Sequence, residues 1–210
     1  MFFRDRMPHV RTVLASWGIK FDRAAAEARV RHQVLDAYLH DTIIDVVCVC
    51  TLFNYEIGSR QLDLLTFQEM EYSLCYRLLN FRALNDASKT PVQAAYHIGL
   101  LMLMMTMFLR FDRRRVLDYR RTTLELSNTL DNWPDDGDNE LLLWLTIVGG
   151  IWISGDLDNE WLHPKIRQVS QNLGLASWDA VLGVIKKFPW LHALHDVPGR
   201  ELWGIVQDSR

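Results

Sequence analysis

The chain of 210 residues is 49% hydrophobic and 23% charged, with a formal net charge of −3, which is the composition of an ordinary globular protein. The negative charge argues against a dedicated nucleic-acid binder, because such proteins carry a basic excess. Three cysteines are too few for a disulfide framework and their odd number suits a reducing compartment. We therefore expect an intracellular protein without a secretory signal.

Helix signals dominate the first half of the chain, after an N-terminal extension of residues 1–21. Asp22 can cap a helix that runs to about His40. The β-branched stretch 43–50 could pass for a strand, but its apolar residues also fit the helical period. No second strand candidate exists, so we predict a buried helix. Residues 61–84 carry apolar side chains at spacings of three and four, which predicts another helix.

The second half continues in the same way. Thr90, Pro91 and Gln93 form a capping box with proline at the first helical position, and predict a helix to about Phe111. Further helices are expected over residues 116–130, 140–153 and 177–187, with others ending at Gly174 and beginning at Asp196. The predicted fold is all-α, an orthogonal multi-helix array that forms a single domain over residues 22–207.

Two apolar runs stand out, Ile98–Leu109 and Leu141–Ile153. Both are shorter than the roughly 20 residues that span a bilayer, so we predict buried helices and no membrane contact. We expect the segments around 100–108 and 142–152 to face each other and to leave a pocket or a dimer surface. Flexible methionine side chains in the first run suit either use.

Cysteine and Glu-x-x-His patterns are incomplete as metal sites. Cys48, Cys50 and Cys75 supply too few thiolates for a binuclear zinc cluster. We interpret them as buried structural thiols. Glu160 and His163 have the spacing that di-iron bundles use, but the second copy of that motif is absent. No metal and no cofactor are therefore expected.

Two histidine patterns have simple structural explanations. His32, Asp36 and His40 are spaced at i, i+4 and i+8, a spacing that also arises on any solvated helix. His195 precedes Asp196, which offers an imidazole beside a carboxylate for acid–base chemistry. No nucleophile motif accompanies this pair, and we interpret Asp196 as the cap of a helix that starts at Pro198.

Six arginines lie between Arg110 and Arg121, which could form a phosphate-binding patch. Arg114 and Asp118 are spaced for an ion pair, and an acidic loop at 131–138 lies nearby in sequence. We favour a solvated, internally paired face and expect no direct contact with nucleic acid.

Residues 141–206 carry a distinctive set of tryptophan, glycine and proline motifs. The set comprises Leu141-Leu-Leu-Trp144, Gly149-Gly150, Glu160-Trp161, Leu173-Gly174-Leu175, Ser177-Trp178, Phe188-Pro189-Trp190 and His195-Asp196-x-Pro198-Gly199-Arg200-x-Leu202-Trp203. With a looser helical pattern over 52–130, this stretch resembles the fungal-specific transcription factor domain, the C-terminal regulatory domain of zinc binuclear cluster transcription factors. The resemblance implies an all-helical, nuclear domain that regulates activity, dimerises or senses small molecules.

The last motifs of this set, from Phe188 to Trp203, predict a packed corner between helices. Pro189 should end one helix, because the residue before a proline avoids the helical region. Trp190 and Trp203 can then pack back on the helices, and Arg200 can pair with Asp196 across one turn.

Two functions remain open. The first is a regulatory or interaction domain without its own DNA-binding module, with a protein partner, a second copy or an apolar small molecule as ligand. The alternative is a small enzyme on the same scaffold that acts on an apolar metabolite of a biosynthetic pathway, as in secondary metabolism. The ligand-binding candidates place polar groups within or beside the apolar helices; they are Tyr96, His97, Trp144 and Asp156.

Overall fold

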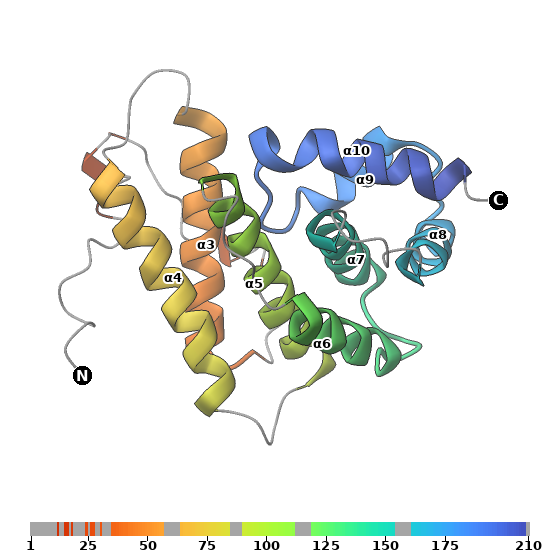
Figure 1. Ribbon diagram of the computed structural model, residues 1–210, viewed down its shortest axis with the longest axis horizontal. Coiled ribbons are helices and arrows are strands. Elements are labelled where there is room, and N and C mark those ends of the chain that lie inside the picture. The colour runs from red at the N-terminus through yellow and green to blue at the C-terminus, as the bar shows by residue number, and fades with distance from the viewer. Residues whose placement is uncertain are drawn as a thin grey trace. The chain divides into compact units, whose positions relative to one another are not determined.

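A computed structural model describes residues 35–56, 64–84, 90–111, 119–153 and 161–208, with isolated positions between 12 and 30. All the secondary-structure elements within these ranges are α-helices (Figure 1), which confirms the predicted all-α class. The helices are α3 (Ala37–Glu56), α4 (Leu64–Leu84), α5 (Pro91–Phe111), α6 (Tyr119–Asp131), α7 (Asn139–Ile153), α8 (Leu162–Asn172), α9 (Trp178–Ile185) and α10 (His192–Asp208).

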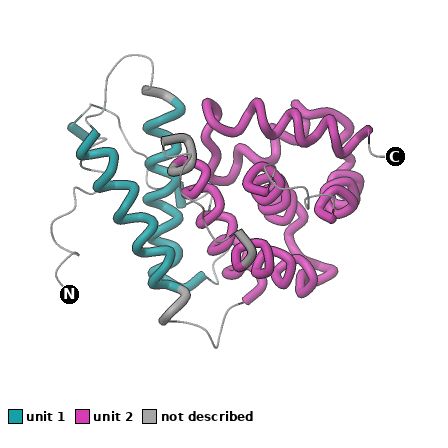
Figure 2. Tube along the Cα trace, in the orientation of Figure 1, with its two compact units in different colours: residues 1–88 teal, residues 89–210 magenta. Residues whose placement is uncertain are grey.

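The chain forms two compact units (Figure 2). Unit 1, Met1–Ser88, contains α3 and α4, and unit 2, Lys89–Arg210, contains α5 to α10. The division falls inside the range 22–207, which is predicted to form one domain.

The helix predicted over residues 22–40 is wrong at its C-terminal end. Val30 lies outside any helix, and α3 begins only at Ala37. Asp36 is the reason, because its Oδ1 accepts hydrogen bonds from the backbone N–H groups of Tyr38, at 2.9 Å, and Leu39, at 3.3 Å. An aspartate in this role is an N-cap residue and precedes the first helical turn. Asp36 therefore precedes α3 and His40 lies within it, while His32 lies outside the described residues.

Helix α3 forms the core of unit 1. The β-branched stretch 43–50 is helical and buried, as predicted. Asp45, the one acidic residue in the stretch 43–50, is 3% exposed and accepts a hydrogen bond of 2.7 Å from Arg77 Nη1 of α4. By length and composition alone the stretch Ala37–Asn54 would suffice to cross a membrane, although 61% of it is buried in the protein. The ion pair between Asp45 of α3 and Arg77 of α4 is typical of two helices that pack against each other inside a protein.

Helix α4 packs on α3 through the stripe that its periodicity predicts. The stripe consists of the buried residues Phe67, Met70, Leu74, Leu78 and Phe81. The ring of Phe67 meets that of Phe53 edge to face, with 5.5 Å between ring centroids. Aromatic and aliphatic contacts of this kind supply most of the stability of a helix pair.

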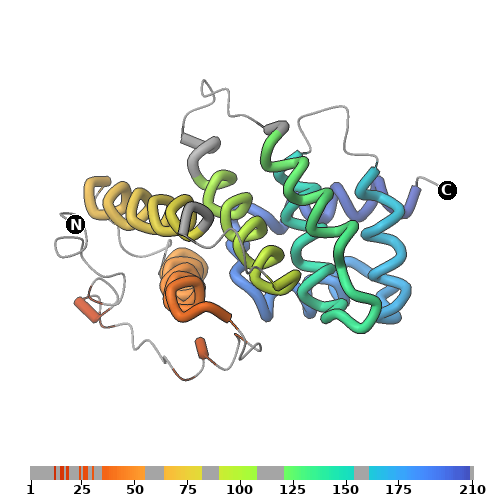
Figure 3. The backbone as a smooth tube through the Cα atoms, turned by 90° about the horizontal axis from the view of Figure 1, so that it is seen from below, coloured from red at the N-terminus to blue at the C-terminus, as the bar shows by residue number. Residues whose placement is uncertain are grey.

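Helix α7 is the centre of unit 2 and contacts α5, α6, α8, α9 and α10 (Figures 1 and 3). All residues from Leu141 to Gly150 are buried, because a helix that is apolar on every side must be covered on every side. The predicted facing of the two apolar runs is confirmed. A Cβ atom at Gly99 of α5 would lie 2.5 Å from the ring of Trp144, so the two backbones approach closely here. Over this stretch α7 leaves no apolar face for a partner.

The capping signals in unit 2 are confirmed. Thr90 Oγ1 accepts a hydrogen bond of 3.3 Å from the backbone N–H of Gln93 at the start of α5. Ser177 Oγ does the same for Ala180 at the start of α9. Gly174 follows α8 with φ of +66°, a conformation that glycine adopts without strain.

The start of α10 differs from the prediction, which placed it near Pro198. The helix begins at His192, and Pro198 lies inside it. The carbonyl of Leu191 accepts the N–H groups of Leu194 and His195, at 3.1 and 2.9 Å, so the first turn forms before the proline is reached. Trp203 is 7% exposed, in agreement with the predicted packed corner.

Candidate functional site

Two of the predicted ligand residues lie together in the core of unit 2. The rings of Tyr96 on α5 and Trp144 on α7 are 6.1 Å apart between centroids. Phe188, from the loop after α9, stacks on Trp144 at 5.6 Å with an interplanar angle of 22°. His97 is also buried, and Asp156 lies outside the described residues. Phe188 was not among the predicted candidates, although its Phe-Pro-Trp motif marked the segment.

This aromatic cluster joins three segments of unit 2 by packing and by one polar contact. Trp144 is completely buried, and its Nε1–H donates a hydrogen bond of 2.9 Å to the carbonyl of Pro189. Buried indole N–H groups require such an acceptor. An apolar ligand at this point would have to displace rings that already contact one another.

The His-Asp motif of α10 is also part of the scaffold. The backbone N–H of Leu191 donates to Nδ1 of His195, at 3.3 Å. The proton of the imidazole must then be on Nε2, which lies 2.7 Å from Thr106 Oγ1 on α5. Thr106 in turn donates to the carbonyl of Leu103 at 2.6 Å. Because both ring nitrogens are engaged and the side chain is 1% exposed, His195 connects α10 to α5 and is poorly placed for proton transfer.

Asp196 does not have the predicted roles of helix cap or partner of Arg200. Its Oδ1 accepts a hydrogen bond of 2.8 Å from Trp190 Nε1. His192 Nδ1 lies 3.1 Å from both carboxylate oxygens, one turn earlier on α10. The Asp196 carboxylate therefore links Trp190, which precedes α10, to the first turn of that helix. Arg200 is exposed.

The cysteines and arginines provide no site within the described ranges. Cys48 and Cys50 are buried, as predicted, and Cys75 is half-buried; all three are described, and none of them forms a disulfide. Within the described residues no group of three or more His, Cys, Asp or Glu side chains could hold a metal ion. The predicted Arg114–Asp118 pair lies outside those residues, whereas Arg121 lies 3.9 Å from Glu125 on the solvent side of α6.

Unit 1 contains a buried carboxyl group that is not among the predicted site residues. Glu71 of α4 is 5% exposed, and its Oε1 has no hydrogen-bond donor within the described residues. Burial raises its pKa from 4.5 to about 7. Burial, and secondarily the charge of Glu71, raises the pKa of the Cys75 thiol to about 12. This thiol is therefore protonated at neutral pH and is a poor nucleophile.

Glu71 makes the stability of unit 1 depend on pH. Between pH 4.5 and pH 7 the folded protein retains a proton on Glu71 that the unfolded chain releases. The free energy of unfolding should therefore fall across this window, by about 3 kcal/mol. Glu71→Gln should remove that fall and leave the variant more stable than the wild type above pH 7. Urea titrations from pH 4 to pH 8 measure this, with Glu69→Gln on the same helix as the matched control. Parallel stability curves for wild type and Glu71→Gln would contradict it.

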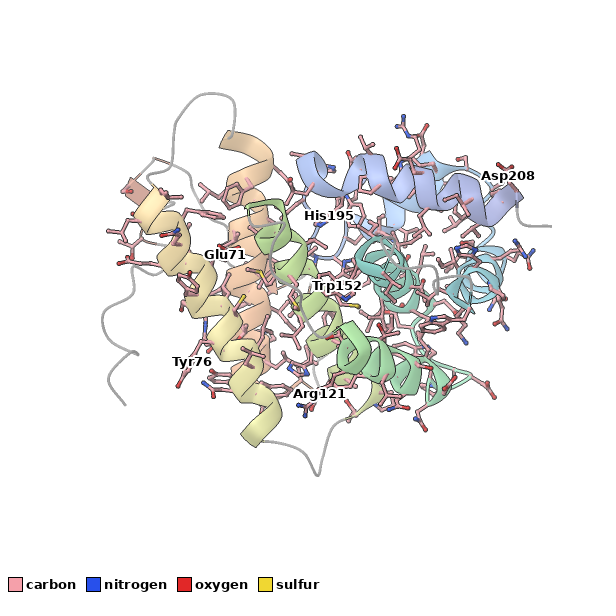
Figure 4. The ribbon with its side chains drawn as sticks, in the orientation of Figure 1. Glu71, Tyr76, Arg121, Trp152, His195 and Asp208 are labelled. Carbon is pink, nitrogen blue, oxygen red and sulfur yellow. The ribbon has the colours of Figure 1, made fainter. Side chains whose placement is uncertain are left out.

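Among the described residues of unit 1, most of the exposed large apolar side chains lie on the outward face of α4. Leu65, Tyr72, Tyr76 and Leu79 are 64%, 51%, 61% and 63% exposed. At about 100° per residue they lie within about 60° of one another on the helix, opposite the stripe that packs on α3. Tyr76 points away from α3 (Figure 4). We name these four residues the α4 outer stripe.

The outer stripe could have been found in the sequence. Its residues follow spacings of seven, four and three, which is a helical period in its own right. The outer stripe is easily overlooked, because the other apolar stripe of the same segment already accounts for the face that packs against a core. A helix with two opposite apolar faces needs neighbours on both sides.

Comparison of the chain with protein-family models, with curated proteins and with solved structures finds no match.

Proposed function

We propose that this chain is a regulatory or protein-interaction domain of the fungal transcription factor type that lacks a DNA-binding module of its own. The observation that carries the proposal is the α4 outer stripe. Exposed apolar side chains that form one contiguous face mark interaction surfaces on globular proteins. Tyrosine, which occupies two of the four positions, is enriched at such surfaces because it combines a large apolar ring with a polar tip.

The proposal also rests on the resemblance of residues 141–206, whose motif residues lie in unit 2. Residues of the shared motifs contact one another across its helices. A Cβ atom at Gly150 would lie 2.4 Å from Leu202, and one at Gly199 would lie 2.5 Å from the ring of Trp178. Motifs that serve as packing contacts are expected in a scaffold domain whose function resides in what it binds. Nuclear localisation and a small-molecule effector belong to the same proposal.

A transcription reporter tests the regulatory role. The full chain is fused to a zinc-cluster DNA-binding module that has no regulatory domain, and expression from its target promoter is compared with that of the module alone. The proposal expects a change of at least about fivefold. A matched fusion with Tyr72→Glu and Tyr76→Glu should lose that change while keeping its protein level. A fusion that behaves like the bare module would refute the proposal.

The chain alone should not bind duplex DNA specifically. Its net charge is −3, and phosphate contacts by lysine and arginine provide most of the affinity of DNA-binding proteins. Any binding should be non-specific, weaker than about 1 μM at physiological salt. Fluorescence anisotropy with random and promoter duplexes measures this. Submicromolar binding that depends on the DNA sequence would contradict the prediction.

A further inference from the structure

We infer that α4 is a pH-sensitive element whose packing on α3 depends on Glu71: the helix packs fully while this carboxyl carries its proton, and ionisation of Glu71 loosens α4 while unit 2 stays folded. As regulation of the α4 outer stripe, the inference rests on the proposed function, because α4 presents that surface. Three observations carry it: where Glu71 lies, which charges surround it, and how α4 is held.

Glu71 lies on the side of α4 that packs on α3. It is one turn from Phe67 and from Leu74, which are both buried in that interface, and its own side chain is 5% exposed. Its Oε1 is buried and has no hydrogen-bond donor among the described residues. A protonated carboxyl group tolerates such a place at moderate cost, whereas a carboxylate without donors or a counter-charge costs far more.

Helices α3 and α4 run antiparallel, and their nearest cation is already engaged. The ring of Phe53 on α3 meets that of Phe67 on α4. Further along, Asp45 of α3 lies 2.7 Å from Nη1 of Arg77 on α4. These two contacts place Glu71 opposite the stretch of α3 around position 50. Arg77 is the described cation closest to Glu71 along the two helices, and it is held by Asp45.

The titratable groups around Glu71 provide no compensating charge within the described helix pair. Those on the facing stretch of α3 are the buried thiols of Cys48 and Cys50, and a thiol is at best a weak donor. On α4 the thiol of Cys75, one turn away, is protonated at neutral pH. The other described titratable side chains lie on the outer side of α4 or more than two turns from position 50 along α3: Glu69, Tyr72, Tyr76, Tyr38, His40 and Asp41.

Helix α4 is held along one face. Among the described helices, α3 is the one on which α4 packs extensively, and the opposite face of α4 carries the exposed outer stripe. Proteins open locally in units that follow such boundaries of packing. Loss of the single α3–α4 interface is therefore enough to free α4, whereas α7 is covered by five other helices.

The direction of the effect follows from the proton on Glu71. Burial raises its pKa from 4.5 to about 7. Between these two values packed α4 retains a proton that the released helix gives up, so release becomes more favourable as the pH rises through this window. Below pH 4.5 both forms bind the proton, and the packing of α4 on α3 is strongest.

Hydrogen–deuterium exchange of the full chain at about pH 5.5 and pH 7.5 tests the switch, with peptides from α4 compared with peptides from α7. Wild type and Glu71→Gln are compared at the same pH, which cancels the chemical dependence of exchange on pH. The ratio of their α4 exchange rates should rise at least about tenfold between the two pH values, and the α7 ratio should stay constant. Glu71→Leu, which is also neutral, should behave like Glu71→Gln. Glu69→Gln, on the outer side of the same helix, should behave like wild type.

Two outcomes would overturn the switch. One is an α4 ratio that is the same at both pH values, and the other is an equal rise in the α7 ratio, which would mean that the whole protein opens. The transcription reporter keeps this test separate from the proposed function. A fusion that responds although the α4 ratio is constant leaves the function without the switch. A pH-dependent α4 ratio in a chain whose fusion gives no response leaves the switch without that function.

Discussion

Replacement of Trp144 by alanine should destabilise unit 2 by about 4 kcal/mol, a large effect for a single substitution. The side chain is completely buried on α7, the helix that every other helix of the unit contacts. The substitution removes the stack on Phe188, the contact with Tyr96 and the donor to the Pro189 carbonyl. It also leaves a cavity that the surrounding helices cannot close without moving. Urea denaturation monitored by circular dichroism measures the loss.

Two further variants separate the parts of this effect. Trp144→Phe keeps an aromatic ring but loses the hydrogen bond to Pro189, and should cost about 2 kcal/mol. Trp161→Ala removes a tryptophan that is 37% exposed and should cost less than about 1 kcal/mol. A loss for Trp144→Ala no greater than for Trp161→Ala would show that Trp144 does not support the core.

Trp203→Ala should destabilise the protein by about 3 kcal/mol. Trp203 is 7% exposed on α10, next to Leu202, which fills the space above Gly150 on α7. Loss of the indole should loosen this helix from the centre of the unit. The variant should therefore lower the melting temperature and the reporter response together.

A functional site at Trp203 has a different consequence, and Ile205→Ala provides the comparison. Ile205 lies on the same helix but is 52% exposed, so its removal should change stability by less than about 0.5 kcal/mol. If Trp203→Ala abolished the reporter response at an unchanged melting temperature, its role as a packing residue would be refuted.

Local chemistry explains which sequence predictions succeeded. Thr90, Ser177 and Gly174 act within a few residues of their own position, by accepting a nearby N–H or by adopting a positive φ. The apolar stripes that face a core are equally local in origin, because they follow from the period of the helix. Tyr96 and Trp144 are predicted as ligand-binding residues, and the sequence does not show that their rings meet in one buried cluster, because that contact joins two different helices.

By itself the sequence determined the helical class, most helix positions and the core faces of α4 and α7, since these depend on propensity, capping and periodicity. The tertiary structure decided what depends on competition among distant groups. Asp196 bonds to Trp190 and His192 instead of Arg200, and the Leu191 carbonyl starts α10 ahead of Pro198. The tertiary structure also decided which of the two apolar stripes of α4 is buried. Both have a helical period, and only the packing of α3 against one of them leaves the other exposed.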